Sequence, residues 1–140
     1  MTKTTPIYLD YMASTPLAPD VLNAMRPYLE DPFWCANPAS VHHWMGQEAL
    51  RVVEQAREKI ALVIGAMPEE IIFTSGATES NNLALFGAAR FYKRQGKHII
   101  TLSTEHKAVL NVVEELAKEG FEVTVLNPMP NGLLDIKKLE

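Results

Sequence analysis

Strand-forming and helix-forming segments alternate through residues 70–126, and this alternation constrains the fold most. Runs of β-branched and aromatic residues at 70–74, 98–102 and 121–126 predict three strands. The amphipathic runs between them predict helices over residues 78–95 and 105–119, each followed by a glycine that is typical of a helix end. Strand, helix, strand, helix, strand is the order of a parallel sheet with right-handed crossovers. The sequence therefore predicts an α/β fold.

The segment before this alternation predicts helices and little else. Residues 18–30 have helical spacing, although Pro27 within the pattern is expected to kink or shorten that helix. From Ser40 a longer amphipathic helix is predicted, with Gly65 as its end. Residues 7–11 indicate a brief strand or an extended arm.

The ends of the predicted elements add two expectations. The helix over residues 78–95 is apolar almost all round, so we expect it to be buried on more than one side. A further helix is predicted to open near Asp135, and the chain stops about one turn later without a terminating signal. We therefore expect a fragment of a longer polypeptide.

Composition limits the class of protein. The chain has 140 residues, of which 47% are hydrophobic, enough for one core. The net charge of -4 and the scattered Lys and Arg residues do not favour nucleic acid or an anionic membrane as a partner. Cys35 is the only cysteine, which excludes an internal disulfide and fits a reducing compartment. No apolar run approaches membrane-spanning length, so we expect a soluble, cytoplasmic protein.

The turn from Ser75 to Thr78 predicts a phosphate site. Backbone N–H groups of Gly76, Ala77 and Thr78 are expected to face outward at the positive end of a helix, beside the hydroxyls of Ser75 and Thr78. The alternative is that Thr78 or Ser75 only caps the helix and that Glu79 complements its dipole. The turn lacks the second glycine and the lysine of a P-loop.

His106 follows the strand at 98–102 and is the second candidate. Ligands of open parallel sheets bind beyond the carboxyl ends of the strands. If the strands at 70–74 and 98–102 are neighbours, His106 lies beside the phosphate site, where its ring could stack on an aromatic ligand or move a proton. The alternative is a histidine that forms only local hydrogen bonds at a helix start.

Other reactive side chains give weaker predictions. His42 and His43 are adjacent and point about 100° apart on a helix, so we expect no metal site there. Lys107 is expected to be a solvated surface lysine, and Cys35 an incidental cysteine with no nearby cation to stabilise a thiolate.

Four segments together resemble the opening motifs of the NifS/IscS-type cysteine desulfurases, of the housekeeping group. Their order and spacing agree with that family, and the resemblance covers essentially the whole chain. The segments are Tyr8-Leu9-Asp10-Tyr11-Met12-Ala13-Ser14-Thr15-Pro16, Asn37-Pro38-Ala39-Ser40 with His43 and Gly46, Phe73-Thr74-Ser75-Gly76-Ala77-Thr78-Glu79-Ser80-Asn81-Asn82-Leu83-Ala84, and Thr104-Glu105-His106-Lys107-Ala108-Val109.

The resemblance implies a pyridoxal 5'-phosphate enzyme of the class V aminotransferase type, usually a homodimer. Its fold would be the three-layer parallel-sheet sandwich of fold-type I, with residues 1–16 as an N-terminal arm and residues 17–140 as the first part of the large, cofactor-binding domain. Such enzymes convert L-cysteine to L-alanine and leave a persulfide on an enzyme cysteine. The sulfur then passes to iron-sulfur scaffold proteins and to sulfur acceptors of tRNA thiolation.

Several residues match functional positions of that family. Ala77 and Thr78 match positions that hold the cofactor phosphate. His106 matches the histidine that stacks on the pyridine ring and assists proton transfer. Asn37 and residues 10–15 match the lining of the site entrance, although Met12 and Ser14 in that segment replace more usual residues.

The Schiff-base lysine, the aspartate partner of the pyridine nitrogen and the persulfide-forming cysteine of the family would lie beyond residue 140. Neither Lys107 nor Cys35 matches them. The 140-residue chain is therefore expected to be inactive on its own. Two other readings stay open at this point: a non-catalytic α/β module that binds a phosphate-bearing ligand or a partner protein, and another pyridoxal-phosphate lyase, acting on selenocysteine or cysteine sulfinate.

Overall fold

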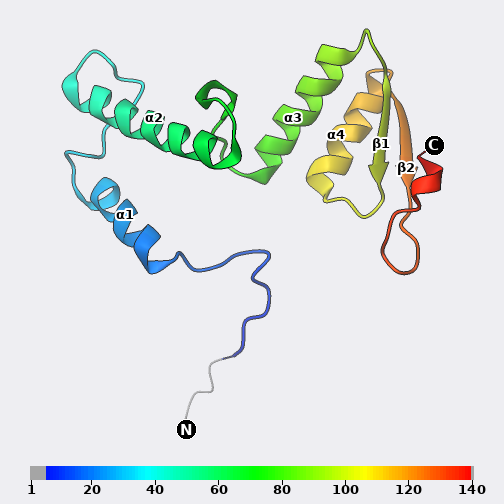
Figure 1. The fold of residues 1–140 in the computed structure, drawn as a ribbon, viewed down its shortest axis with the longest axis horizontal. Coiled ribbons are helices and arrows are strands. Elements are labelled where there is room, and N and C mark those ends of the chain that lie inside the picture. The colour runs from blue at the N-terminus through cyan, green and yellow to red at the C-terminus, as the bar shows by residue number, and fades with distance from the viewer. Residues whose placement is uncertain (1–5, 140) are drawn as a thin grey trace. The chain divides into compact units, whose positions relative to one another are not determined.

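The computed structural model describes residues 6–139 and divides the chain into two compact units, one ending at Ile71 and one beginning at Ile72 (Figure 1). The first unit contains the helices α1 (Pro19–Glu30) and α2 (Trp44–Ile64) and the short 3-10 helix η1 (Pro68–Glu70). The predicted division into an arm over residues 1–16 and a domain over residues 17–140 stays a prediction.

The helix predicted over residues 18–30 is confirmed as α1. Pro27 lies inside α1 but does not shorten it, because the helix continues to Glu30 and the N–H of Asp31 donates to the Pro27 carbonyl at 3.2 Å. Residues 7–11 form no strand, and no strand in residues 6–71 supplies a partner for one. Of the two expectations for that segment, the strand is wrong.

α2 begins at Trp44, four residues later than the pattern predicted. Before it, the chain turns at Asn37, whose side-chain oxygen accepts from the N–H of Ala39 at 2.9 Å. The buried Gly46 in the first turn of α2 lets this loop lie against the helix, since a Cβ at Gly46 would stand 2.0 Å from the Ser40 carbonyl oxygen. The predicted stop is confirmed: Gly65 ends α2 in the left-handed conformation, with φ 70°.

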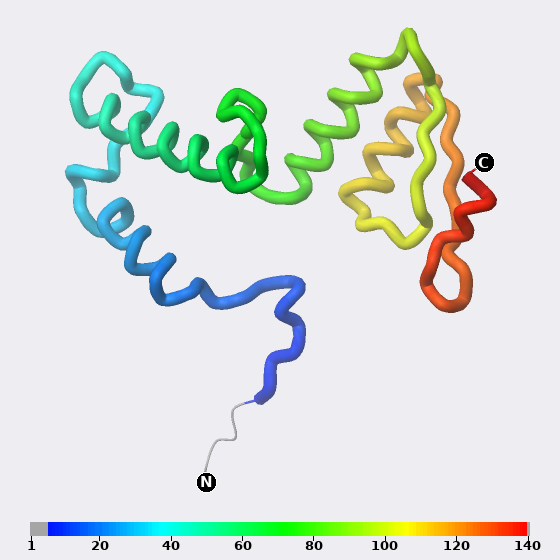
Figure 2. The backbone as a smooth tube through the Cα atoms, viewed as in Figure 1, coloured from blue at the N-terminus to red at the C-terminus, as the bar shows by residue number. Residues whose placement is uncertain are grey.

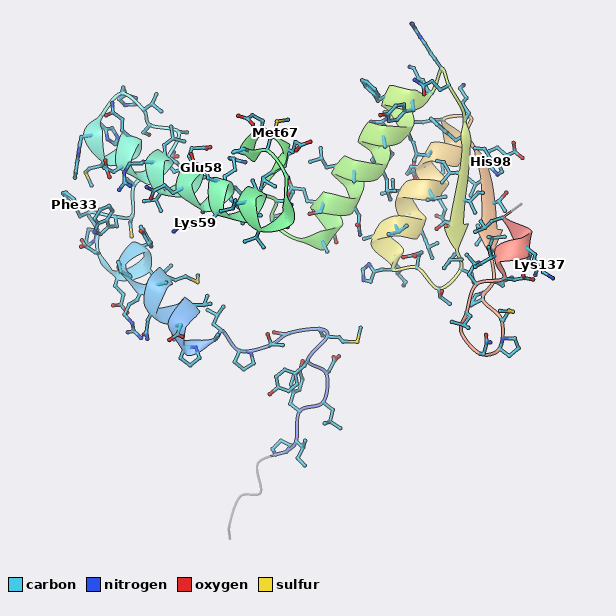
Figure 3. The ribbon with its side chains drawn as sticks, viewed as in Figure 1. Phe33, Glu58, Lys59, Met67, His98 and Lys137 are labelled. Atoms are coloured by element: carbon cyan, nitrogen blue, oxygen red, sulfur yellow. The ribbon has the colours of Figure 1, made fainter. Side chains whose placement is uncertain are left out.

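Aromatic contacts hold the loop between α1 and α2. The ring of Phe33 lies 5.8 Å from that of Trp34 and 4.8 Å from that of Trp44, the first residue of α2 (Figure 3). Trp34 also meets the edge of Tyr28 in α1 at 6.0 Å. Edge and tilted arrangements are those that aromatic pairs favour. The loop is therefore fixed to both helices of the first unit.

The second unit confirms the predicted α/β class with parallel strands. It contains α3 (Ala77–Tyr92), β1 (His98–Leu102), α4 (Lys107–Lys118), β2 (Glu122–Leu126) and the 3-10 helix η2 (Ile136–Lys138). β1 and β2 pair in parallel, with a register that runs from His98 opposite Glu122 to Leu102 opposite Leu126. α4 is the connection between the two strands, as a parallel pair requires.

The strand predicted over residues 70–74 is not formed, which corrects the sequence analysis. Pro68–Glu70 is a 3-10 helix, and the residues from Ile71 to Thr74 have no regular structure. Ile71 has an extended backbone, with φ -93° and ψ 122°, but no strand in the described residues pairs with this segment. A strand needs a partner for its backbone groups, so extended geometry alone does not make one.

α3 packs on α4, and α4 contacts β2. Figure 2 shows that both helices run opposite to β1 and β2, so both begin at the end of the unit where the strands finish. The core of the unit consists of Val112, Leu116 and Phe121, against which Leu85, Phe86, Ala89 and Ile99 pack.

The burial predicted for α3 on more than one side is not seen in residues 72–139. One side packs on α4, but no residue of α3 is fully buried, and Phe91 keeps 78% of its surface exposed.

Candidate functional site

The N-terminus of α3 has no side-chain cap. Its N-cap residue is Gly76, which has no side chain that could accept a hydrogen bond, and Ala77 and Thr78 are the first two helical residues. The hydroxyl of Ser75 does not cap the helix either, because it donates to Glu79. The first N–H groups of a helix have no intrahelical acceptor. The alternative that Thr78 or Ser75 caps the helix is therefore wrong, and Ala77 and Thr78 stand where an anion would find free donors.

Glu79 is engaged with the residue before the N-cap. One oxygen of its carboxylate accepts from both the backbone N–H and the hydroxyl of Ser75, each at 2.7 Å. The Ser75 hydroxyl bond, followed by the Ser75 backbone bond, lowers the pKa of Glu79 below its ordinary value. The sequence indicated only that Glu79 complements the helix dipole; this contact was missed, because a residue pattern does not specify the direction of a side chain.

Ser80 also forms hydrogen bonds within this turn. Its hydroxyl lies 2.6 Å from that of Thr74 and donates to the carbonyl of Gly76 at 3.2 Å. Asn82 then donates to the carbonyl of Thr78 at 2.7 Å. The turn and the first helical residues of α3 are thus linked by a short network of local hydrogen bonds.

His106 is the N-cap of α4. Its Nδ1 accepts from the backbone N–H of Ala108 at 3.0 Å, so the neutral ring carries its proton on Nε2. This is the local hydrogen bond of the alternative considered for this histidine. It leaves Nε2 and both ring faces for other contacts, so it does not conflict with a role toward a ligand.

The packing of α3 on α4 brings the two helix N-termini to one edge of the unit. A hollow of about 230 Å³ between the helices is lined by Thr78 and Asn82 of α3 and by Ala108 and Asn111 of α4, among others. The strand pairing from which the sequence inferred this proximity is absent, since the neighbour of β1 is β2. Helix packing, not strand adjacency, relates Thr78 to the start of α4.

The remaining candidates have other surroundings. The Nδ1 of His43 accepts from Gly46 N–H at 3.1 Å and so caps α2. Lys107 is exposed at the first position of α4, as expected, and the Cys35 thiol donates to the Tyr28 carbonyl at 3.1 Å. Within residues 6–139, no three His, Cys, Asp or Glu side chains cluster closely enough to hold a metal ion.

None of the helices between residues 6 and 139 is both long enough and apolar enough to span a bilayer.

Comparison with known proteins defines the class. The model of the aminotransferase class-V family matches residues 7–140. The cysteine desulfurase IscS of Neisseria meningitidis serogroup C / serotype 2a is 56% identical over 140 residues, which is 100% of this chain and 34% of that protein. The cysteine desulfurase IscS of Klebsiella pneumoniae subsp. pneumoniae is 55% identical over 135 residues, covering 96% of this chain and 33% of the relative.

Solved structures give the same class. A NifS-like protein matches 96% of this chain and 36% of its own length, with a TM-score of 0.85 and 38% identity. The structure of SspA in complex with cysteine matches 94% of this chain and 37% of its own, with a TM-score of 0.80 and 48% identity. The fold of this chain is thus shared with both structures.

The chain belongs to the aminotransferase class-V family, and its resemblance to the NifS/IscS-type cysteine desulfurases is confirmed. It spans about a third of the length of the curated relatives it matches.

Proposed function

We propose that this chain forms the N-terminal part of a pyridoxal-phosphate-dependent cysteine desulfurase. The enzyme would convert L-cysteine to L-alanine and hold the sulfur as a persulfide. The supporting observation is the 56% identity, over the whole chain, to a relative named cysteine desulfurase IscS. The relative SspA, solved in complex with cysteine, supports L-cysteine as the substrate.

The residues at the start of α3 fit the phosphate of this cofactor. The first N–H groups of the helix lack a side-chain cap, and the helix dipole favours an anion at this end. Apart from its chain neighbours, no heavy atom lies within 4 Å of where a Cβ on Gly76 would stand, so the space beside this residue is open. The backbone of Ala77 and the backbone and hydroxyl of Thr78 would hold the phosphate.

His106 would contact the ring of the cofactor. When bound, pyridoxal phosphate supplies the electron sink that weakens bonds at the α and β carbons of cysteine. The cap on α4 fixes Nδ1 of His106 toward Ala108, which leaves Nε2 as the nitrogen able to exchange a proton. The imidazole is thereby oriented by the backbone of its own helix.

Partners and location follow from the same family. We propose that the full enzyme is a cytoplasmic homodimer that delivers sulfur to iron-sulfur scaffold proteins and to sulfur-acceptor proteins of tRNA thiolation. The net charge of -4 does not favour direct nucleic-acid binding.

The alternatives are not favoured. A non-catalytic module is disfavoured by relatives at 55–56% identity that are all named cysteine desulfurase. A lyase for selenocysteine or cysteine sulfinate gains no support from those relatives or from the solved structure with cysteine.

Thr78→Val in the full-length enzyme tests the phosphate assignment. Valine keeps the shape of threonine but removes the hydroxyl, so the dissociation constant of pyridoxal phosphate should rise about tenfold or more, as for a lost hydrogen bond to a charged group. Thr124→Val, the same change on β2, should leave the constant unaltered. If Thr78→Val binds the cofactor as tightly as the parent enzyme does, the assignment of Thr78 is wrong.

A further inference from the structure

The carboxylate of Glu79 faces backward from α3 onto the turn that precedes the helix. A single oxygen accepts two hydrogen bonds from Ser75, one from the backbone and one from the hydroxyl. Both bonds are 2.7 Å long, within the short range of charge-assisted hydrogen bonds. Glu79 therefore holds the main chain of Ser75, not only its side chain.

This contact lies directly beside the donors proposed for the phosphate. Ser75 precedes the N-cap Gly76, and Ala77 and Thr78 follow it. Because both donors of Ser75 are used by Glu79, Ser75 offers none to a ligand, and the outward donors start after it. The orientation of those N–H groups depends on the backbone angles at Ser75 and Gly76. Glu79 bonds to Ser75, while Ser80 and Thr74 both donate to the carbonyl of Gly76.

We propose that Glu79 is a positioning residue for the cofactor phosphate. Its carboxylate fixes Ser75 so that the N–H groups of Ala77 and Thr78 converge on one anion. The bond to Ser75 also turns the negative charge of Glu79 back toward donors of the turn. The inference rests on the proposed function, because it assumes that the start of α3 binds the phosphate.

The test compares two ligands in the full-length apoenzyme: pyridoxal phosphate and pyridoxal, which lacks the phosphate. Cofactor absorbance or fluorescence quenching gives both dissociation constants. Glu79→Ala should raise the dissociation constant of pyridoxal phosphate about tenfold, the effect of losing a hydrogen bond to a charged group. The same variant should leave the dissociation constant of pyridoxal almost unchanged, because the bonds between Glu79 and Ser75 affect binding only through the phosphate.

Two further variants sharpen the comparison. Glu79→Gln keeps a side-chain oxygen that can accept from Ser75, so it should restore part of the preference for pyridoxal phosphate. Ser75→Ala removes one of the two bonds without touching Glu79 and should give a smaller loss in the same direction. Glu58→Ala, at an exposed glutamate in α2, is the control and should change neither constant (Figure 3).

The outcomes separate this inference from the proposed function. Suppose that Thr78→Val lowers the preference for pyridoxal phosphate over pyridoxal but Glu79→Ala does not. The positioning role proposed for Glu79 is then wrong, and the assignment of the phosphate site is retained. An equal loss for both ligands in Glu79→Ala would show general damage to the fold and would also overturn the role. If neither Thr78→Val nor Glu79→Ala changes the preference, the phosphate assignment itself fails.

Discussion

His106 Nδ1 accepts a 3.0 Å hydrogen bond from the backbone N–H of Ala108, which makes the proposed ring partner of the cofactor also the N-cap of α4. One side chain thus has two separable tasks. An alanine substitution removes both at once, so a loss of activity in that variant does not identify the chemical role of the ring.

His106→Asn separates the two tasks. The oxygen of asparagine can accept from the Ala108 N–H, since asparagine is among the preferred N-cap residues, but it has no Nε2 and no aromatic face. We expect His106→Asn to keep the stability of the full-length enzyme and to lose turnover. His106→Ala should lose turnover and also about 1 kcal/mol of stability.

Denaturant unfolding and sulfide release measure the two properties for each His106 variant. Normal turnover in His106→Asn would remove the imidazole from the mechanism. Equal stability of the Asn and Ala variants would show that the cap contributes nothing measurable.

Gly46→Ala should destabilise the first unit. The added Cβ would stand 2.0 Å from the Ser40 carbonyl oxygen and 3.1 Å from that of Asn37, and both are backbone atoms that cannot rotate away. We expect a loss of about 1 to 3 kcal/mol, the usual effect of overpacking. Thermal or denaturant unfolding of the full-length protein measures it.

Gly87→Ala is the matched control for this change. Gly87 lies inside α3 and has open space around its missing Cβ, so alanine should raise stability by up to about 1 kcal/mol through its better helix propensity. A neutral Gly46→Ala would mean that the loop at Asn37 to Ser40 does not pack against α2 as described.

Leu116→Ala should be among the most damaging single changes in the second unit. Leu116 is 1% exposed and lies in the core beside Val112 and Phe121. Truncation of such a leucine costs about 2 to 5 kcal/mol of unfolding free energy. Val125→Ala, at a side chain that is 50% exposed, should cost far less. Similar losses for both would contradict the position of the core.

Glu119 gives a prediction for acid pH. Arg90 of α3 donates to both oxygens of this carboxylate, at 3.2 and 2.5 Å, and the bond to Arg90 is the largest cause that lowers the pKa of Glu119. A carboxyl whose pKa is lower in the folded state stabilises the fold above its unfolded pKa. That contribution disappears as the pH falls through the folded pKa.

We therefore expect Glu119→Gln to lower stability at neutral pH and to make the acid side of the stability profile less steep. The difference from the parent protein should begin to shrink as the pH falls below the ordinary glutamate pKa of about 4.3. It should vanish below the lowered pKa of Glu119 in the folded protein. Because the pair is exposed, added salt should also reduce the difference. If the stability of Glu119→Gln changes with pH in parallel with that of the parent protein, the Arg90–Glu119 pair does not contribute to the pH dependence of stability. Glu114→Gln, at an exposed glutamate inside α4, serves as control.

The fold could be predicted where local sequence determines structure. β1 has the bounds expected for it, since a short apolar run between polar residues is sufficient to mark it. The buried face of α4 was also expected, because Val112, Val113 and Leu116 share its helical spacing and are all buried. The prediction of a strand at residues 70–74 was wrong, because strand pairing depends on a partner that no local pattern specifies.

The candidate site was predicted in part. The sequence identified Ala77, Thr78 and His106 from turn chemistry and resemblance, and their roles remain proposals. It placed the helix start near residue 105 and so did not identify His106 as a cap. It also missed the bonds between Glu79 and Ser75, since composition tells which groups are present and only the backbone path decides which of them meet.

The core of the second unit has a consequence for biosynthesis. Every residue in that cluster lies between Leu85 and Phe121, so its contacts join segments that are close along the chain. The entropy lost on closing such loops grows only slowly with their length. As the chain leaves the ribosome, every residue of this cluster is available once Phe121 has emerged, and β2 can pair with β1 once Leu126 follows.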